Sequence, residues 1–251
     1  MNTQIRFDLE ITLNSAWHVG TGLSRGLLDR TTRRNARGEV YLPASTIKGR
    51  VRDACERLAR LYISNDEKLH GCQPPDPMNM CRGNDPCVIC RIFGSAYVGE
   101  RLFFEDATLR SDLGEIYDPV DQSHPRTRVK LNRRKGIAEA GHLFSAEYVE
   151  PQLVFRTQVM GNLPLTFLVG GVERADLEKA YEAYELILLV AGIRSVKELG
   201  GDKSAGFGAC EMAFASDIQL RLKPEEELKP VSPTDLIADW LEWLEYYGTE
   251  Q

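Results

Sequence analysis

The chain has 251 residues, of which 43% are hydrophobic and 27% charged, as is ordinary for a folded soluble protein with one elaborate domain or two small ones. The N-terminal sequence MNTQIRFDLE contains no apolar run, so we expect no secretory signal. No segment reaches the roughly 18 apolar residues that span a bilayer. We therefore expect a protein of the reducing cytoplasm that has no membrane partner.

The charge of the chain is unevenly distributed. The net charge is −6, and residues 223–251 alone hold eight acids against two lysines. Residues 21–52 hold eight arginines and lysines against two acids, and residues 122–135 hold six against none. Two basic tracts on a nearly neutral body suit a groove for a polyanion, although solvated loops carry such charge as well.

The first half of the chain begins with strict alternation of apolar and polar residues over 5–13, which predicts a half-buried strand. A loop follows over 15–43. Ser45 then has the place of an N-cap for a helix over about 46–63. The apolar face of this helix consists of Ile47, Val51, Cys55, Leu58 and Tyr62. Cysteine, proline and glycine exclude regular structure from 66–90, and a strand is expected over 101–109.

The second half of the chain opens with a polar, basic protrusion over 118–148. Apolar segments at 149–160 and 163–172, separated by GNLP, predict a hairpin. A helix over about 175–196 follows, with Leu177, Tyr181, Tyr184, Leu188 and Ala191 facing inward. The glycine-rich loop GGDKSAGFG occupies 200–208, and a strand is expected over 209–221. SPTD at 232–235 then starts an amphipathic helix that contains Trp240, Trp243 and Leu244.

Without its insertions, the chain has the order strand, helix, strand, strand or hairpin, helix, strand. This β-α-β-β-α-β order is that of the ferredoxin-like fold, in the α+β class.

Four of the six cysteines are clustered, at Cys72, Cys81, Cys87 and Cys90, with the last two in a CxxC spacing. Thiolates at such spacing suit a tetrahedral zinc ion, and four protein ligands leave no open position for water. The cluster therefore indicates structural zinc, with His70 as a substitute for one thiolate. A disulfide or redox pair and free thiols are the alternatives. Cys55 and Cys210 are most simply core residues.

Three further segments carry groups that suit phosphate. Ser45 and Thr46 lie where a helix N-terminus presents free N–H groups, and Lys48 and Arg52 share one helix face. Lys203 and Ser204 lie in the glycine-rich loop. The basic tract places Arg126, Arg128 and Lys130 in strand register, on one side of an extended hairpin. A solvated face or an ordinary turn explains each segment taken alone.

The combination of four segments resembles the RAMP superfamily, and most closely the backbone subunit that polymerises along guide RNA in type III CRISPR effector complexes. The segments are HVGTG with LLDRTT, LPASTIKGRVRDA, CVICRIFGS, and PRTRVKLNRRKGIAEAGHLFSAEYV ahead of GGDKSAGFG. The resemblance spans residues 5 to about 215. It implies guide RNA, target RNA and the other subunits of the complex as partners.

The resemblance also implies an architecture. Residues 1–222 form an RRM-like palm, with a zinc-binding insertion over 66–92 and a thumb hairpin over 118–148 that intrudes into the guide–target duplex. The acidic tail over 223–251, with its helix, has no counterpart in the family. One departure concerns Lys203, because many relatives carry an arginine there.

The family's catalytic aspartate lies in the loop after the first strand, where this chain has Asp29. Five arginines, among them Arg25 and Arg30, surround it and are expected to contact phosphate. The resemblance implies cleavage of target RNA, with Asp29 holding Mg²⁺ or a similar divalent cation or taking the 2′-OH proton.

Two other functions remain open. In the first, the chain is a guide-binding scaffold without an active site, and Asp29 only pairs with Arg30 or Arg33. In the second, it is a RAMP endoribonuclease that processes repeat RNA through His18 or His124.

Overall fold

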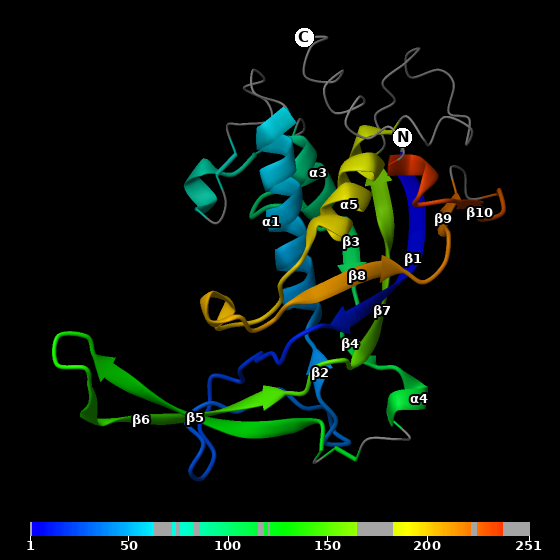
Figure 1. Ribbon diagram of the computed structural model, residues 1–251. Helices are drawn as coiled ribbons and strands as arrows, with labels where there is room; N and C mark the ends of the chain where they lie inside the picture. Colours follow the sequence, from blue (N-terminus) through cyan, green and yellow to red (C-terminus); the bar gives the residue numbers. More distant parts are fainter. Residues whose placement is uncertain are drawn as a thin grey trace.

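The computed structural model describes residues 2–62, 72–73, 76–82, 86–114, 118–119, 121–164, 183–221 and 225–237. They form a mixed α/β protein that consists mostly of sheet (Figure 1). Among the described residues, no helix combines the length and the apolarity that a membrane crossing requires.

The elements follow one another along the chain as strands with interspersed helices. The strands are β1 Asn2–Leu13, β2 Tyr41–Leu42, β3 Leu102–Phe104, β4 Ala107–Leu109, β5 Ser123–Asn132, β6 Ile137–Val149, β7 Val154–Pro164, β8 Cys210–Phe214, β9 Ile218–Arg221 and β10 Lys229–Val231. The α-helices are α1 Ala44–Tyr62, α3 Val88–Phe93, α4 Ser111–Gly114 and α5 Tyr184–Ser195. Short 3-10 turns cover Pro77–Asn79, Lys203–Ala205 and Asp235–Ile237.

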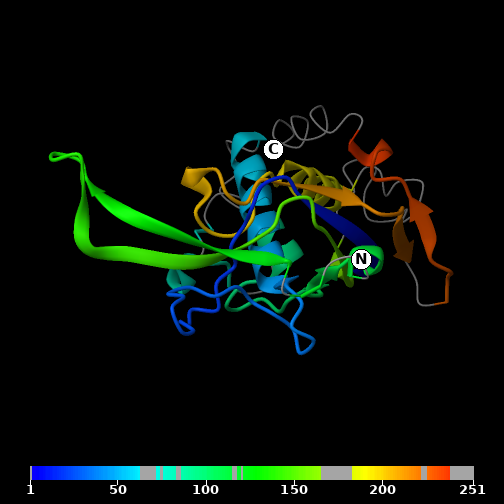
Figure 2. The ribbon, with the colours of Figure 1, turned by 60° about the horizontal axis from the view of Figure 1, so that its bottom comes forward.

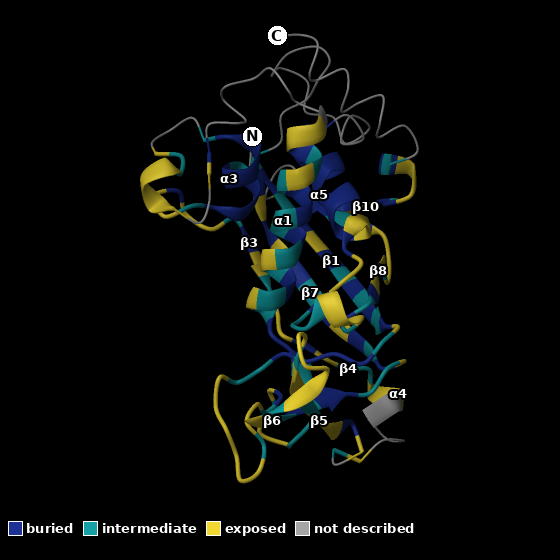
Figure 3. Cartoon of the chain, turned by 60° about the vertical axis from the view of Figure 1, so that its left-hand side comes forward, coloured by how far each residue is buried: buried dark blue, intermediate teal, exposed yellow. Residues whose placement is uncertain are grey.

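The main sheet is antiparallel and has β1 and β7 at its centre, in the order β10-β9-β1-β7-β4-β2. β8 also pairs with β1, and β3 also pairs with β7. The apolar side chains of β1 are buried in one cluster with those of α1 and α5, so both helices lie on the same side of the sheet. Figure 3 shows this buried layer between helices and strands.

The strand predicted over 5–13 is confirmed, and so is the apolar face of the first helix up to Leu58; the side chain of Tyr62 lies outside the described part of the structure. Ile47, Val51 and Cys55 are buried and Leu58 packs against the core. Ser45, however, is not the N-cap, because α1 already begins at Ala44. The N–H of Ala44 donates instead to Oδ1 of Asp106 at 2.7 Å, so an acid from the β3–β4 link caps this end of the helix.

The hairpin predicted around GNLP is wrong. β7 runs through this sequence to Pro164 and pairs with β1 along its whole length, from Thr12 opposite Val154 to Asn2 opposite Pro164. Gly161 serves close packing in place of a turn, because a Cβ there would overlap the carbonyl oxygen of Arg101. The rest of the predicted second strand, 165–172, lies outside the described residues.

Regular structure inside 66–90 was not expected, but a 3-10 turn covers Pro77–Asn79 and α3 begins at Val88. The strands predicted over 101–109 and 209–221 are each interrupted, at 105–106 and at 215–217. α5 confirms the described part of the second helix, with Tyr184, Leu188 and Ala191 buried. Leu177 and Tyr181 lie outside the described residues.

The C-terminal segment adds a strand that was not predicted, since β10 pairs with β9. A short 3-10 turn follows at Asp235–Ile237, where Leu236 is buried in the core. The predicted helix beyond it, with Trp240, Trp243 and Leu244, lies outside the described residues.

The basic protrusion forms a two-stranded sheet of its own, in which β5 pairs with β6 from Ser123 opposite Val149 to Asn132 opposite Ile137. This β5–β6 hairpin extends away from the body of the protein (Figure 2). Its base lies against the loop that follows β1, as the bridge between Trp17 and Val149 shows.

Candidate functional site

A groove of about 580 Å³ lies where α1 begins. Three other segments meet there: the turn after β1, the loop that carries Arg30, and the glycine-rich loop. The lining residues are His18, Val19, Gly20, Gly22, Arg30, Ser45, Thr46, Gly49, Arg50, Gly200 and Gly201. The groove thus joins segments that are far apart in the sequence.

The groove has the electrostatic character of an anion site. The N-terminal turn of α1, with Ser45 and Thr46, adds the positive end of a helix dipole to its wall. Arg30 and Arg50 bring two guanidinium groups, of which that of Arg50 also pairs with Asp53 at 3.2 Å and donates to the carbonyl oxygen of Glu198 at 3.2 Å. Gly49 carries no side chain there, and a Cβ at this position would meet no atom within 4 Å, so a ligand can approach the backbone closely.

Two of the residues expected to bind RNA lie on another side of α1. Lys48 forms an ion pair with Glu100 and donates to the carbonyl oxygen of Leu102 at 3.0 Å. Burial, together with the charge of Arg52, lowers the pKa of Lys48 to about 8. Arg52 pairs with Glu56 at 2.8 Å and donates to the carbonyl oxygen of Gly94 at 3.0 Å. The structure therefore does not bring Lys48 and Arg52 to the groove, whereas it brings Arg50 there.

Asp29 lies on the free edge of β6, where residues 29–30 add a short parallel segment. The N–H of Asp29 donates to the carbonyl oxygen of Ser145 at 2.9 Å, and the N–H of Ser145 donates to Oδ2 of Asp29 at 2.7 Å. The N–H of Glu147 donates to the carbonyl oxygen of Arg30 at 2.9 Å. These bonds fix the backbone of Asp29 and the direction of its exposed carboxylate.

Asp29 does not act as the counter-ion of its neighbouring arginines in this structure. Within the described ranges, no cationic side chain lies at ion-pair distance from its carboxylate. Arg30 instead approaches Asp202 at 3.8 Å, and Arg34 pairs with Glu147 at 2.7 Å. Arg25 lies in the exposed turn that its bridge to Leu28 closes.

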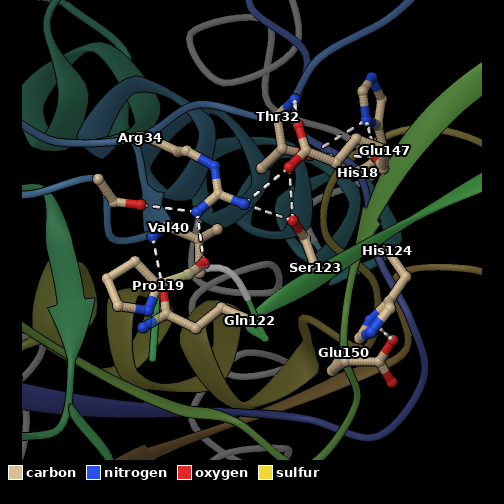
Figure 4. A network of polar contacts seen from close by, with 11 residues as sticks. His18, Thr32, Arg34, Val40, Pro119, Gln122, Ser123, His124, Glu147 and Glu150 are labelled. Carbon is tan, nitrogen blue, oxygen red and sulfur yellow. Dashed lines mark hydrogen bonds and ion pairs between the residues drawn. The ribbon is translucent and has the colours of Figure 1, made fainter. Parts of the chain in front are cut away.

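Glu147 on β6 holds the loop of Asp29 in place (Figure 4). Its carboxylate accepts hydrogen bonds from the N–H of Thr32 at 2.9 Å, from Arg34 at 2.7 Å and from the hydroxyl of Ser123. Burial by itself raises the pKa of Glu147, but these hydrogen bonds outweigh burial and hold the pKa below its ordinary value. Arg34 is thus a structural arginine.

Substitution of Glu147 by glutamine is expected to lower the free energy of unfolding at pH 7 by about 1–2 kcal/mol, because it weakens charge-assisted hydrogen bonds. Since the folded-state pKa is depressed, this stabilisation is present above the unfolded pKa and is lost as pH falls through the folded pKa. Urea unfolding at pH 7 and at acid pH checks both points. Glu211→Gln, at an exposed position, is the control; an equal loss in both variants would contradict the role of Glu147.

A second cluster joins the glycine-rich loop to the base of the hairpin. The hydroxyl of Tyr148 donates to Oδ2 of Asp202 at 2.5 Å, and Arg128 and Arg30 approach the same oxygen at 3.5 and 3.8 Å. The guanidinium of Arg128 lies over the ring of Phe207 at 4.6 Å, and that of Arg126 at 5.5 Å. Three of the predicted RNA contacts, Arg30, Arg126 and Arg128, are therefore brought together.

The charges in this cluster influence one another. Burial and the hydrogen bond to Asp202 raise the pKa of Tyr148 to about 12. Burial also acts to raise the pKa of Asp202, but the Tyr148 hydrogen bond and the charges of Arg128 and Arg30 lower it below its usual range. Lys203 and Ser204 follow Asp202 in the 3-10 turn. Lys130 lies farther along the hairpin, paired with Glu139 at 2.7 Å.

The four clustered cysteines come together, with Sγ atoms that all lie within 4.8 Å of one another. Cys87 precedes α3 and Cys90 lies in its first turn. Zinc–sulfur bonds of about 2.3 Å in a tetrahedron place sulfur atoms about 3.8 Å apart, so the arrangement fits one zinc ion. All six cysteines are free thiols. His70 lies outside the described residues.

The two histidines considered as catalysts have different surroundings. His18 is 4% exposed and its Nδ1 lies 2.7 Å from the carbonyl oxygen of Glu147. His124 is exposed on β5 and its Nδ1 lies 2.9 Å from Glu150. His18 lines the groove, whereas His124 is not among the lining residues.

Sequence reasoning missed Arg50, Glu147 and Asp202. Arg50 could have been found from the sequence. It lies two residues from both Lys48 and Arg52 on the same helix, and this spacing places it on a different face. Glu147 and Asp202 had no such signal, since their partners lie far away in the sequence, from 24 positions for Ser123 and Glu147 to 115 for Thr32 and Glu147.

Comparison with known proteins found relatives of the chain in sequence and in fold. A sequence model of the RAMP superfamily matches residues 10–211. The protein named CRISPR system Cms endoribonuclease Csm3 from Methanocaldococcus jannaschii is 26% identical over 226 residues, which cover 86% of this chain and 80% of that protein.

Two cryo-EM structures of the type III-B Cmr-beta complex contain chains of similar fold. The chain from the complex bound to cognate target RNA has a TM-score of 0.54 and 14% identity, over 83% of this chain and 96% of the other. The chain from the apo state has a TM-score of 0.54 and 15% identity, over 84% and 98%. Since the family match covers most of its length, the chain belongs to the RAMP superfamily.

Proposed function

We propose that this protein is an RNA-binding backbone subunit of a type III CRISPR effector complex, which holds guide RNA and cleaves complementary target RNA through Asp29. The observation that carries the proposal is the set of contacts around Arg30: it lines the groove, it approaches Asp202 together with Arg128, and the carboxylate of the adjacent Asp29 lacks a protein cation within the described ranges. The names of the relatives agree with it.

The strand order supports a ferredoxin-like palm over residues 1–222. Taken as four units, the central strands lie in the order β8/β9, β1, β7, β3/β4, all antiparallel, with α1 and α5 on one face. This is the arrangement that a β-α-β-β-α-β chain adopts when its two helices cover one side. The β5–β6 hairpin corresponds to the proposed thumb, and 66–92 to the zinc-binding insertion.

Guide RNA is proposed to bind with its backbone in the groove, against the N-terminal turn of α1 and the glycine-rich loop. Ser45, Arg30, Lys203 and Ser204 lie on or beside this path, and Arg126 and Arg128 adjoin it at the base of the thumb. In such complexes base pairing determines the sequence, and the protein contacts the RNA backbone. Lys48 and Arg52 would have to leave their present ion pairs to take part.

The proposed cleavage uses a carboxylate at the scissile phosphate, and Asp29 is suited to this role. The backbone N–H of Ser145 donates a hydrogen bond to Oδ2 of Asp29, and this bond orients the carboxylate. A divalent cation, when bound, would polarise the phosphate. Within the described ranges, only the four cysteines bring three or more metal-binding groups together. Such a cation would therefore take its other oxygen ligands from RNA and water, as Mg²⁺ commonly does. Alternatively, Asp29 accepts the 2′-OH proton.

The cysteine cluster is proposed to hold structural zinc, because four thiolates complete its coordination. Arg91, next to Cys90 in α3, forms an ion pair with the fully buried Glu185 of α5 at 3.2 Å. Zinc at the cluster would thereby fix α3 against the core of the palm. It would have a structural role and take no part in RNA cleavage.

The two other functions have less support. A scaffold without an active site would pair Asp29 with Arg30 or Arg33, but Arg30 approaches Asp202 instead and, within the described ranges, Arg33 forms no ion pair with Asp29. A histidine-dependent endoribonuclease would need an accessible imidazole at the scissile bond. His124 is accessible, but it lies beside Glu150 and not in the groove.

Salt dependence of RNA binding tests the proposed groove. The affinity of the purified chain for single-stranded RNA is expected to fall linearly on a log–log plot against salt. The double variant Arg30→Gln and Arg128→Gln should bind more weakly and lose about 0.7 of the slope for each phosphate contact removed. Arg110→Gln, which removes an arginine paired with Asp112, is the control. A flat salt response, or equal effects in control and double variant, would overturn the proposal.

A further inference from the structure

The buried His18 has a defined tautomer in its neutral form. Its Nδ1 lies 2.7 Å from the carbonyl oxygen of Glu147 and 3.4 Å from the hydroxyl oxygen of Thr32, and that hydroxyl donates to the same carbonyl at 3.1 Å. A carbonyl oxygen only accepts hydrogen bonds, so Nδ1 carries the hydrogen. In a neutral imidazole the second nitrogen, Nε2, is then an acceptor.

Nε2 of His18 points away from the network around Glu147 (Figure 4). Within the part of the chain that the structure describes, this nitrogen has no hydrogen-bond partner. His18 nevertheless lines the groove and is only 4% exposed. A nearly buried side chain therefore offers an unused acceptor to the ligand of the groove.

Gly20 keeps the approach to this nitrogen open. A Cβ at position 20 would lie 2.9 Å from Nε2, closer than real Cβ atoms come to their neighbours. Gly20 does not adopt a left-handed conformation, so its backbone does not require glycine. The missing side chain leaves space directly at Nε2, in the wall that Gly20 and Gly22 share.

The chemistry of the groove restricts what this acceptor binds. The other polar groups, Arg30, Arg50 and the N-terminal turn of α1, are donors or positive and suit phosphate oxygens. Phosphate oxygens accept and cannot bond to an unprotonated nitrogen. Base edges are engaged in guide–target pairing. The ribose 2′-hydroxyl is the remaining donor of an RNA backbone, and it distinguishes RNA from DNA.

We propose that His18 is the residue by which the groove recognises ribose, with Nε2 accepting a hydrogen bond from a 2′-hydroxyl of the strand whose phosphates lie against α1. This inference rests on the proposed function, since it requires that the groove bind RNA. It adds sugar specificity to that function and gives His18 no catalytic role.

His18→Asn tests the proposal, because an asparagine amide can replace the Nδ1 donor but has no group at the position of Nε2. Affinities for an RNA oligonucleotide and for DNA of the same sequence are compared at several salt concentrations. Wild-type protein should prefer RNA. The variant should lose about 2- to 10-fold in RNA affinity, with DNA affinity and salt slope unchanged.

Gly20→Ala provides a second test that keeps His18 itself, because the added methyl group covers Nε2. It should lower RNA affinity as His18→Asn does and leave DNA affinity unchanged. Gly99→Ala is the matched control, since a Cβ there meets no atom within 4 Å.

Three outcomes would overturn the inference. Equal losses for RNA and DNA would make His18 a structural residue or a phosphate contact, and unchanged RNA affinity in both variants would exclude the 2′-hydroxyl contact. The proposed function survives either result. Wild-type protein that binds neither strand would overturn the inference and the proposed function together.

Discussion

Substitution of Asp29 by asparagine is expected to slow target-RNA cleavage in the assembled complex by about 10²- to 10⁴-fold. RNA binding should stay within about twofold of wild type, because asparagine can still accept the hydrogen bond from the N–H of Ser145 that orients this side chain. The variant removes only the negative charge that would hold a cation or accept a proton. Single-turnover cleavage of a complementary RNA with Mg²⁺ measures the loss.

The controls for Asp29 separate the three candidate functions. Asp217→Asn removes an exposed acid outside the groove and should cut like wild type. EDTA should stop the wild-type reaction if Asp29 works through a divalent cation. Undiminished cleavage by Asp29→Asn at every site, in a complex that contains no other paralogue of this subunit, would contradict the assignment. Cleavage that persists in EDTA but requires His18 would favour the histidine-dependent endoribonuclease.

Loss of the metal site should have the largest effect on stability. Cys90→Ser is expected to lower the free energy of unfolding by about 3–5 kcal/mol, or roughly 10–15 °C in Tm, because it removes one of the four proposed zinc ligands, a buried thiol in α3. Metal analysis should find about one zinc per wild-type chain and much less in the variant.

Cys210→Ser is the matched control for the metal, since this buried thiol lies outside the cluster and its loss should leave the zinc content unchanged. Prolonged treatment of the wild-type protein with a chelator should lower its Tm to that of the Cys90→Ser variant. A wild-type protein that is well folded and free of metal would contradict the zinc site.

The sequence predicts best where a local pattern corresponds to one structural environment. Strict alternation over 5–13 specified β1, because one face of that strand is buried and the other is not. Helical periodicity located α1 to within two residues. The grouping of four cysteines followed from ligand spacing alone, and their Sγ atoms do come together.

Prediction failed where long-range packing decides the local structure. GNLP has turn composition, but Gly161 is required by the close approach of β3 to β7. α3 is short and nearly all its residues are buried, so VICRIF has no amphipathic pattern to detect.

The site was predicted in part for the same reason. Helical spacing placed Lys48 and Arg52 on one face of the helix. The direction of each side chain depends on its ion-pair partner, and the partner of Lys48, Glu100, was not predictable from the sequence. The pair between Arg52 and Glu56 was foreseeable, because its i, i+4 spacing is a known signal for ion pairs. The role of Asp202 becomes visible only in the fold, which places the glycine-rich loop against the β5–β6 hairpin.

The most direct test of the account is the position of Asp29 relative to the RNA. A structure of the assembled complex with guide RNA and an uncleavable target should place the Asp29 carboxylate about 3 Å from the 2′-OH next to the scissile phosphate. Alternatively, the carboxylate and a phosphate oxygen should both bind one divalent cation, at about 2.1 Å for Mg²⁺. An Asp29 that lies beyond reach of a scissile phosphate, while another group occupies that place, would contradict it.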